Sequence, residues 1–336
     1  MRRFARLGLT VLALLAATPG AAAGDEATAA ALPRYSINGV YAAGISSGGY
    51  FATQLHVAYS GTFSGSAVFA GGPYYCAQQN VFRAQYACMK DWQDDQLPQL
   101  ETITRNWSSQ GLIDPVDNLS GDKVYVFHGT NDSTVVSSVT GDLATYHRDF
   151  GADVRYQSTT PAGHAWVSPE GPNPCGATYT PYINNCGTDP EGQFLGHLFG
   201  SANPPNTGSP QGTLTRYDQN PYAVGGSAAA LSLGPEGFLY TPASCANGAT
   251  CRLMVVLHGC NQGYASIGTK LIDTGYVNEY ADTNNMVVLY PQAVAKSGSN
   301  PQGCWDWWGY LGEADYARHG GAQLDTVLAM VRGLGG

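Results

Sequence analysis

The segment GISSGG, residues 44–49, contains the pattern G-x-S-x-G centred on Ser46. Between a strand and a helix, this pattern forms a sharp turn that exposes the central hydroxyl at the carboxyl edge of a sheet. Residues 36–46 are β-rich and residues 48–60 have a helical pattern, so the context fits. The sequence therefore predicts Ser46 as a nucleophile, with the backbone N–H of Ser47 directed at a developing oxyanion. A purely structural glycine-rich turn is the alternative.

A serine hydroxyl needs a base, and in hydrolases with this turn the acid and the histidine follow the serine in the chain. Asp132 ends the loop after a predicted strand, and His164 comes 32 residues later in a loop of small residues. One helix and one strand separate them, so both loops should reach the same edge of the sheet. We expect Asp132 as the acid and His164 as the base. The alternatives are a turn role for Asp132 and, for the base, His147 or His197.

The elements that must position these residues alternate between short β-rich runs and helical stretches. This pattern is typical of a mostly parallel sheet with helices on both faces. Two separate domains would each have too few strands for a doubly wound sheet, so we expect one shared sheet. Residues 169–228 are rich in Gly, Pro, Asn and Ser and are predicted to be surface loops. Strands are predicted within residues 36–46, 65–72, 122–132, 152–160, 237–242, 251–261 and 285–292, and helices within 48–60, 138–152, 271–284 and 321–334.

The order of the motifs along the chain is unusual. Residues 257–260 read LHGC, and in α/β-hydrolases an HG motif after an early strand places a backbone N–H in the oxyanion hole. Here this motif follows Ser46 by more than two hundred residues, although it should precede the nucleophile. Joining the two ends of the chain restores the usual order. The sequence therefore predicts an α/β-hydrolase fold that is circularly permuted, with its break just before the nucleophile strand.

Residues 1–23 have the pattern of a signal peptide: three arginines, an apolar run and small residues at 21–23. An N-terminal helix is the alternative. Without this leader the chain has 13 basic and 25 acidic residues, a net charge of −12. Nucleic acid and anionic lipid are therefore not expected partners, and no later stretch resembles a membrane helix. We expect an exported, soluble protein whose residues 24–336 form a single catalytic domain.

Eight cysteines in an exported chain indicate disulfide bonds. Zinc spacings such as CxxC or HExxH are absent, so we expect neither a metal nor an organic cofactor. Sequence alone permits many connectivities. The spacing suggests three local pairs and one remaining pair: Cys76 with Cys88, Cys175 with Cys186, Cys245 with Cys251, and Cys260 with Cys304.

Six segments together resemble the circularly permuted catalytic domain of poly(3-hydroxybutyrate) depolymerases: GISSGGYFATQ, HGTNDSTV, AGHAW, CRLMVVLHGCNQ, VVLYPQ and NPQGCWDWWGY. The resemblance covers essentially the whole chain after the leader. It implies Ser46 as nucleophile, Asp132 as acid and His164 as base, with the backbone N–H groups of Ser47 and Cys260 forming the oxyanion hole.

The resemblance also implies that Trp307 lines a hydrophobic cleft for a polyester chain. Trp305 and Trp308 lie beside it in sequence and are candidates for the same cleft. Large aromatic side chains are also frequent core anchors, so packing is the alternative, above all for Trp305.

The activity expected from this resemblance is that of a secreted, monomeric serine esterase. It would hydrolyse poly(3-hydroxybutyrate) or its oligomers through an acyl-enzyme. Many extracellular members carry an additional polymer-adhering domain, whereas this chain ends directly after the helix predicted at 321–334. We therefore expect amorphous polymer, oligomers or soluble esters as substrates. The alternatives are a secreted carboxylesterase for small or feruloyl-type esters and a catalytically silent polymer-binding protein.

Overall fold

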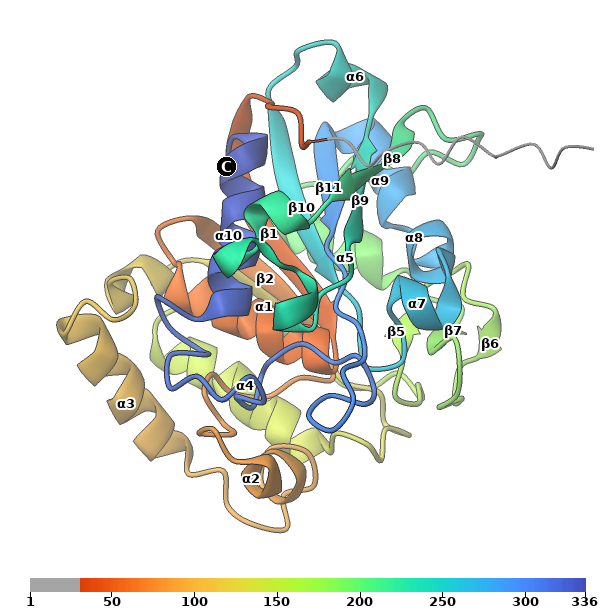
Figure 1. Ribbon diagram of the computed structural model, residues 1–336. Coiled ribbons are helices and arrows are strands. Elements are labelled where there is room, and N and C mark those ends of the chain that lie inside the picture. Colours follow the sequence, from red (N-terminus) through yellow and green to blue (C-terminus); the bar gives the residue numbers. More distant parts are fainter. Residues whose placement is uncertain (1–30) are drawn as a thin grey trace, which may run out of the picture.

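A single large sheet organises the chain in the computed structural model, which describes residues 31–336 (Figure 1). Its eight strands lie in the order β4-β3-β2-β1-β10-β11-β9-β8 within these residues. All pairs are parallel except β11–β9 and β9–β8. The strands are β1 (Ile37–Ile45), β2 (Phe63–Phe69), β3 (Lys123–Phe127), β4 (Asp153–Gln157), β8 (Thr213–Asp218), β9 (Glu236–Thr241), β10 (Cys251–Leu257) and β11 (Met286–Tyr290).

The two halves of the chain meet in the middle of this sheet. Strand β1 pairs with β2 on one side and with β10 on the other, so β1–β4 and β8–β11 form the two halves. The Tyr35 N–H donates to the Leu334 carbonyl over 2.8 Å, which places the segment before β1 against the end of helix α10 (Ala322–Leu334). Joining these ends would put β8–β11 before β1. The structure therefore confirms the permuted strand order predicted from the late HG motif.

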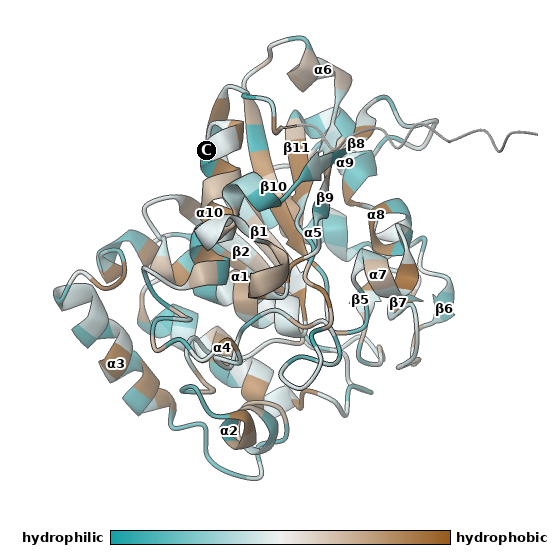
Figure 2. Cartoon of the chain, in the orientation of Figure 1, coloured by the Kyte–Doolittle hydropathy of each residue, from teal (hydrophilic) through white to brown (hydrophobic). Residues whose placement is uncertain are grey.

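Helices cover both faces of the sheet, as predicted. One face packs against α1 (Ser47–Ala58), α4 (Ser137–Asp149) and α10, and the other against α5 (Pro190–Leu198) and α9 (Val277–Asn284). Strand β10 shows why: Leu253 and Val255 face the first core, whereas Met254 and Val256 face the second. Alternate residues of a strand point to opposite faces, so a strand buried on both sides must be apolar throughout. The hydrophobic colouring of β11 shows the same property (Figure 2).

The prediction that residues 169–228 contain only loops is wrong. Helix α5 starts there at Pro190, with the Asp189 side chain accepting the Gly192 N–H over 2.8 Å. Strand β8 lies at the sheet edge, where residues 213–216 are exposed and give no apolar pattern. Such short or edge elements carry little hydrophobic periodicity. Residues 166–185 also form a small separate sheet of β5 (Trp166–Val167), β7 (Ile183–Asn185) and β6 (Asn173–Pro174).

Several helices differ from the prediction as well. The helix expected at 271–284 is divided into α8 (Lys270–Thr274) and α9, because Tyr276 adopts a left-handed φ of 62° between them. Such a φ interrupts a right-handed helix. Four further helices had no counterpart in the sequence analysis: α2 (Val81–Tyr86), α3 (Leu97–Ser109), α6 (Ala243–Ala246) and α7 (Tyr264–Ile267).

Disulfide bonds join all four pairs suggested by the cysteine spacing: Cys76–Cys88, Cys175–Cys186, Cys245–Cys251 and Cys260–Cys304. The predicted signal peptide, residues 1–23, lies outside the described residues. Across residues 31–336, no helix combines the length and apolar character needed to cross a bilayer.

His147 in α4 gives the fold a predictable acid sensitivity. It is fully buried, and neither ring nitrogen has a hydrogen-bond partner among residues 31–336. Its ring stacks on His56 with centroids 5.4 Å apart, and His56 in turn contacts the Asp122 carboxylate over 3.0 Å. Burial, with the neighbouring His56 as a smaller cause, lowers the pKa of His147 well below its ordinary value. The folded protein therefore keeps this ring neutral in mildly acidic solution.

We expect the His147→Phe variant to lose part of the acid sensitivity of the parent protein. Above a pH of about 6.5 the ring is neutral in both the folded and the unfolded chain. Below it only the unfolded chain binds the proton, so the parent loses up to about 1.4 kcal/mol of stability per pH unit from this group. Urea unfolding at pH values of about 7.5 and 5 measures the difference. Equal losses in parent and variant would contradict the role of His147.

Candidate active site

The turn between β1 and α1 holds Ser46 in a strained backbone conformation. Its φ is 56° and its ψ is −124°, a combination that non-glycine residues rarely adopt and that clusters at functional sites. The Ser46 N–H donates to the Phe69 carbonyl over 2.9 Å, which fixes the turn to the end of β2. A Cβ on Gly48 would lie 2.2 Å from the Leu257 carbonyl oxygen, so only glycine lets the turn approach β10 this closely. The predicted nucleophile turn therefore has the expected shape and place.

Asp132 and His164 form a hydrogen-bonded pair at the same edge of the sheet. His164 Nδ1 donates to Asp132 Oδ2 over 2.7 Å, and both residues are 8% exposed. The other carboxylate oxygen of Asp132 accepts the N–H groups of Thr134 and Val135, at 2.8 and 3.1 Å. With Nδ1 carrying the donated proton, Nε2 of His164 is the nitrogen that can accept one.

Backbone hydrogen bonds hold the acid loop and the base loop together. Thr130 N–H donates to the Thr160 carbonyl over 2.8 Å, and Asn131 N–H to the Ala162 carbonyl over 3.1 Å. The two loops follow the neighbouring parallel strands β3 and β4, which explains why residues 32 positions apart meet. As the sequence predicted, one helix and one strand, α4 and β4, lie between Asp132 and His164.

Ser46 and His164 line one small pocket of about 190 Å³. Within residues 31–336, the serine hydroxyl and the imidazole are not hydrogen-bonded to each other. Catalytic contacts of this kind often close only when substrate is bound. The alternative base His197 lies elsewhere: its Nε2 bonds to the Asp153 carbonyl at the start of β4, whereas Ser46 follows the end of the parallel strand β1. His147 is buried in α4.

The loop after β10 lies directly against the nucleophile. A Cβ on Gly259 would be 3.5 Å from Ser46 Cβ, and Cys260 lines the pocket beside the serine. Among the backbone bonds of residues 31–336, none uses the N–H of Ser47 or of Cys260. Both N–H groups therefore lack a backbone acceptor, as donors to an oxyanion must.

His258 stiffens this loop rather than acting as a second base. Its Nδ1 donates to the Gly259 carbonyl over 2.7 Å, and its Nε2 accepts the Ala293 N–H over 3.1 Å. Burial lowers the pKa of His258 to about 4, so the ring stays neutral and keeps both bonds at neutral pH.

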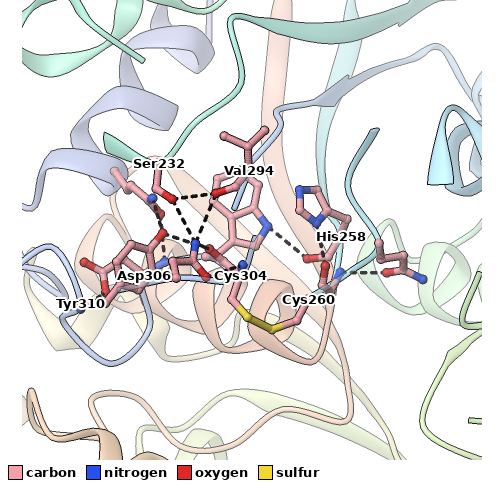
Figure 3. The surroundings of a disulfide bond; sticks show 12 residues. Ser232, His258, Cys260, Val294, Cys304, Asp306 and Tyr310 are labelled. Carbon is pink, nitrogen blue, oxygen red and sulfur yellow. Dashed lines mark hydrogen bonds between the residues drawn. A yellow bond between two sulfur atoms is a disulfide. The ribbon is translucent and has the colours of Figure 1, made fainter. Parts of the chain in front are cut away.

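The Cys260–Cys304 disulfide ties this loop to the tryptophan-rich segment that follows Cys304 (Figure 3). Trp305 is fully buried, stacks on Phe51 with ring centroids 4.9 Å apart, and donates from Nε1 to the His258 carbonyl over 3.1 Å. Its side chain belongs to the hydrophobic core and lines no part of the cleft beside Ser46. The burial and packing of Trp305 therefore favour the packing alternative over a role in binding substrate.

Trp307 and Trp308 line a larger cleft of about 460 Å³ that also reaches Ser46. Trp307 stacks on Tyr50 with centroids 4.1 Å apart. The segment that carries both tryptophans is held in place by Asp306, whose buried side chain accepts the N–H groups of Tyr310 and Leu311. The burial of this carboxyl group raises its pKa to about 7.

Another part of the cleft lining had no counterpart in the sequence analysis. It includes apolar side chains from within or just after the Cys76–Cys88 loop and from the acid loop, namely Val81, Ala84, Met89 and Val135. Adjacent to it, Phe82 is 66% exposed and Trp92 is 70% exposed. In the sequence, the apolar residues between the two nearby cysteines, Cys76 and Cys88, could have indicated this part of the cleft.

Replacing Trp305 and Trp307 by alanine should have different consequences. Trp305→Ala removes a fully buried ring, so we expect about 3–5 kcal/mol lower stability. Trp307→Ala also removes a largely buried ring and should lower stability, but because this ring lines the cleft we expect KM for an oligomeric ester to rise several-fold as well. Chemical unfolding and steady-state kinetics separate the two. A KM change without a stability change in Trp305→Ala would contradict this assignment.

Within residues 31–336, no group of three or more His, Cys, Asp or Glu side chains is arranged to hold a metal ion.

The chain matches no protein-family model. It is 42% identical over 295 residues to the poly(3-hydroxybutyrate) depolymerase of Delftia acidovorans, an alignment covering 86% of this chain and 58% of that protein. It is 40% identical over 330 residues to the polyhydroxybutyrate depolymerase of Talaromyces funiculosus, covering 91% and 93% of the two chains. The chain therefore spans little more than half the length of the Delftia protein and nearly all of the Talaromyces protein.

Two solved structures are similar over the same extent. One is a PHB depolymerase with a serine-to-alanine substitution in complex with an R3HB trimer, with a TM-score of 0.83 and 36% identity, covering 90% of this chain and 98% of that one. The other is the PHB depolymerase from Penicillium funiculosum, with a TM-score of 0.82 and 37% identity over the same shares of the two chains.

Proposed function

The chain belongs to the poly(3-hydroxybutyrate) depolymerase family, and we propose that it hydrolyses the ester bonds of this polyester or its oligomers with Ser46 as nucleophile. The observation that carries the proposal is the convergence of Ser46, the Asp132–His164 pair and the Cys260 backbone N–H at one pocket between the carboxyl ends of β1 and β10. Each group matches one role in acyl transfer.

In the proposed reaction, Nε2 of His164 removes the proton from Ser46 Oγ as this oxygen attacks the ester carbonyl. Asp132 holds the imidazole in the required tautomer and stabilises its charged form. The N–H groups of Ser47 and Cys260 bind the oxyanion. The alcohol then leaves with the proton held by His164, and a water molecule activated by the same histidine hydrolyses the acyl-enzyme.

The residues that line the two pockets support an assignment of the two sides of the substrate. His164 must protonate the departing alcohol, and it lines the smaller pocket together with Ser46. The alcohol portion therefore occupies the smaller pocket. The acyl portion occupies the larger cleft, whose walls include Trp307, Met89 and Val135. A chain of methyl-substituted ester units suits these apolar walls.

Exposed hydrophobic side chains favour an insoluble substrate over a small soluble ester. Phe82 stacks on Tyr86, and Tyr86 on Trp92, in a patch next to the cleft residue Val81. Contiguous exposed aromatic groups mark interaction surfaces. A secreted carboxylesterase for small or feruloyl-type esters has no use for such a patch, whereas an enzyme that works on the surface of a polyester granule does.

The clearing of amorphous poly(3-hydroxybutyrate) granules, measured beside turnover of soluble nitrophenyl and feruloyl esters, tests the substrate class. We expect clearing, and we expect a Phe82→Ser/Trp92→Ser variant to clear granules more slowly while keeping its turnover of soluble esters. The matched control is Leu214→Ser, an exposed apolar residue on edge strand β8. Turnover of soluble esters without any clearing would instead support the carboxylesterase.

We also propose that the protein is exported and acts as a monomer, with residues 24–336 forming one catalytic domain. Four disulfides within the described residues support an oxidising compartment. The sheet shared by both halves of the chain supports one folding unit.

A further inference from the structure

Gln262 joins the two loops that must act on the same ester carbonyl. It is 1% exposed and lines the small pocket beside Ser46. Its Oε1 accepts the Gly259 N–H over 2.8 Å, next to the proposed oxyanion donor Cys260. Its Nε2 donates to the carbonyls of Pro181 and Tyr182, at 3.2 and 2.9 Å. One buried side chain therefore bridges the loop after β10 and the segment 175–186.

Segment 175–186 is the support of the base loop. The Gly163 N–H donates to the Cys175 carbonyl over 2.9 Å, and the His164 N–H donates to Thr178 Oγ1 over 2.9 Å. The Trp166 N–H donates to the Tyr182 carbonyl, the same oxygen that receives Gln262 Nε2. The position of His164 is thus set by a segment whose own position is set in part by Gln262.

From this geometry we propose that Gln262 is a positioning residue that fixes the oxyanion hole relative to the general base. The inference rests on the proposed function, because it assigns Gln262 to that reaction. In the transition state the oxyanion must lie on the Cys260 N–H while the serine proton lies on His164. A small change in the separation of the two loops disturbs both contacts at once. Binding of the ground-state ester depends mainly on the apolar walls of the larger cleft, which Gln262 does not line, and should change much less than kcat.

Two replacements of Gln262 remove different sets of its side-chain hydrogen bonds. Gln262→Met keeps the approximate shape and volume and removes all three side-chain hydrogen bonds. Gln262→Glu can still accept the Gly259 N–H, but its carboxylate faces the carbonyl oxygens of Pro181 and Tyr182 and repels them. Both should lower kcat, and the glutamate variant by at least as much as the methionine variant.

The control is a second buried amide with the same bonding pattern at the other edge of the sheet. Asn284, at the end of α9 and just before β11, accepts the Asn203 N–H over 2.7 Å. It donates to the Asn203 and Tyr280 carbonyls, at 3.1 and 2.9 Å. Asn284→Leu is nearly isosteric. It should lower stability, as Gln262→Met does, and leave kcat at the parent value.

The experiment measures kcat and KM on a soluble 3-hydroxybutyrate ester, with each rate normalised to the folded, active fraction by titration with a serine-directed phosphonate. For Gln262→Met we expect kcat to fall about 10- to 100-fold while KM changes by no more than about twofold. Normalisation keeps the result meaningful where a variant is partly unfolded. Parent values of kcat in both Gln262 variants would overturn the positioning role.

Parent protein and Ser46→Ala belong in the same assay. An inactive parent, or a Ser46→Ala variant as active as the parent, would mean that the proposed function fails. An active parent that depends on Ser46, together with undiminished kcat in Gln262→Met and Gln262→Glu, would mean that only the role of Gln262 fails.

Discussion

Replacing Ser46 by alanine is expected to lower kcat for ester hydrolysis by a factor of about 10⁶, the order measured when a triad serine is removed from another protein. The variant loses the oxygen that we propose forms the acyl-enzyme, while the proposed oxyanion donors and the cleft remain. Binding of a 3-hydroxybutyrate oligomer should therefore persist. Steady-state rates and oligomer binding to the same preparation measure both consequences.

Ser60→Ala is the matched control for this substitution. Ser60 lies just beyond the other end of α1, and its hydroxyl donates to the Pro115 carbonyl over 3.2 Å. This variant should keep the parent kcat. Hydrolysis by Ser46→Ala at the parent rate would remove Ser46 from the mechanism and require another nucleophile, whereas no hydrolysis by either protein would support the catalytically silent polymer-binding alternative.

The second large effect is expected from Asp132→Asn. The amide oxygen can still accept the N–H groups of Thr134 and Val135, so the loop should keep its shape. The amide nitrogen, however, cannot accept the proton that His164 Nδ1 donates. The imidazole then favours the other tautomer and loses its role as base, so kcat should fall by about 10⁴. Rates measured on a soluble ester report this loss directly.

Asp122→Asn distinguishes catalysis from simple removal of an aspartate–histidine pair. Asp122 accepts from His56 Nε2 over 3.0 Å and lies just before the start of β3, whereas Asp132 lies beyond its end, and Asp122 lines neither pocket beside Ser46. We expect a lower melting temperature and a parent-like kcat. Equal losses of kcat in Asp122→Asn and Asp132→Asn would show that the effect at Asp132 is one of folding.

The permuted sheet and the meeting of the Asp132 and His164 loops at one edge of it could be predicted because they depend on local patterns. Ser46 lies in a turn with its own signature, Asp132 follows the buried apolar strand β3, and His164 follows β4, an edge strand that is β-rich in sequence but only partly buried. The carboxyl ends of parallel strands meet at one edge, so the type and order of elements are enough to bring these loops together. The late HG motif marked the permutation for the same reason.

Features that depend on long-range packing could not be predicted in this way. Whether Trp305 or Trp307 faces the cleft depends on the Cys260–Cys304 disulfide and on the bond from Trp305 to the His258 carbonyl. Gln262 has no pattern of its own, because its partners Pro181 and Tyr182 lie about eighty positions away. Edge strand β8 is exposed and lacks the apolar alternation that marks the central strands.

The most direct test of the account is to trap the acyl-enzyme. The Asp132→Asn protein, mixed with a 3-hydroxybutyrate oligomer and quenched in acid, should carry a 3-hydroxybutyryl group on the peptide that contains Ser46, as identified by mass spectrometry. Ser46→Ala treated in the same way should carry none. An adduct on a different residue, or hydrolysis of the oligomer by Ser46→Ala at the parent rate, would contradict the central claim that Ser46 cleaves a polyester through a covalent intermediate.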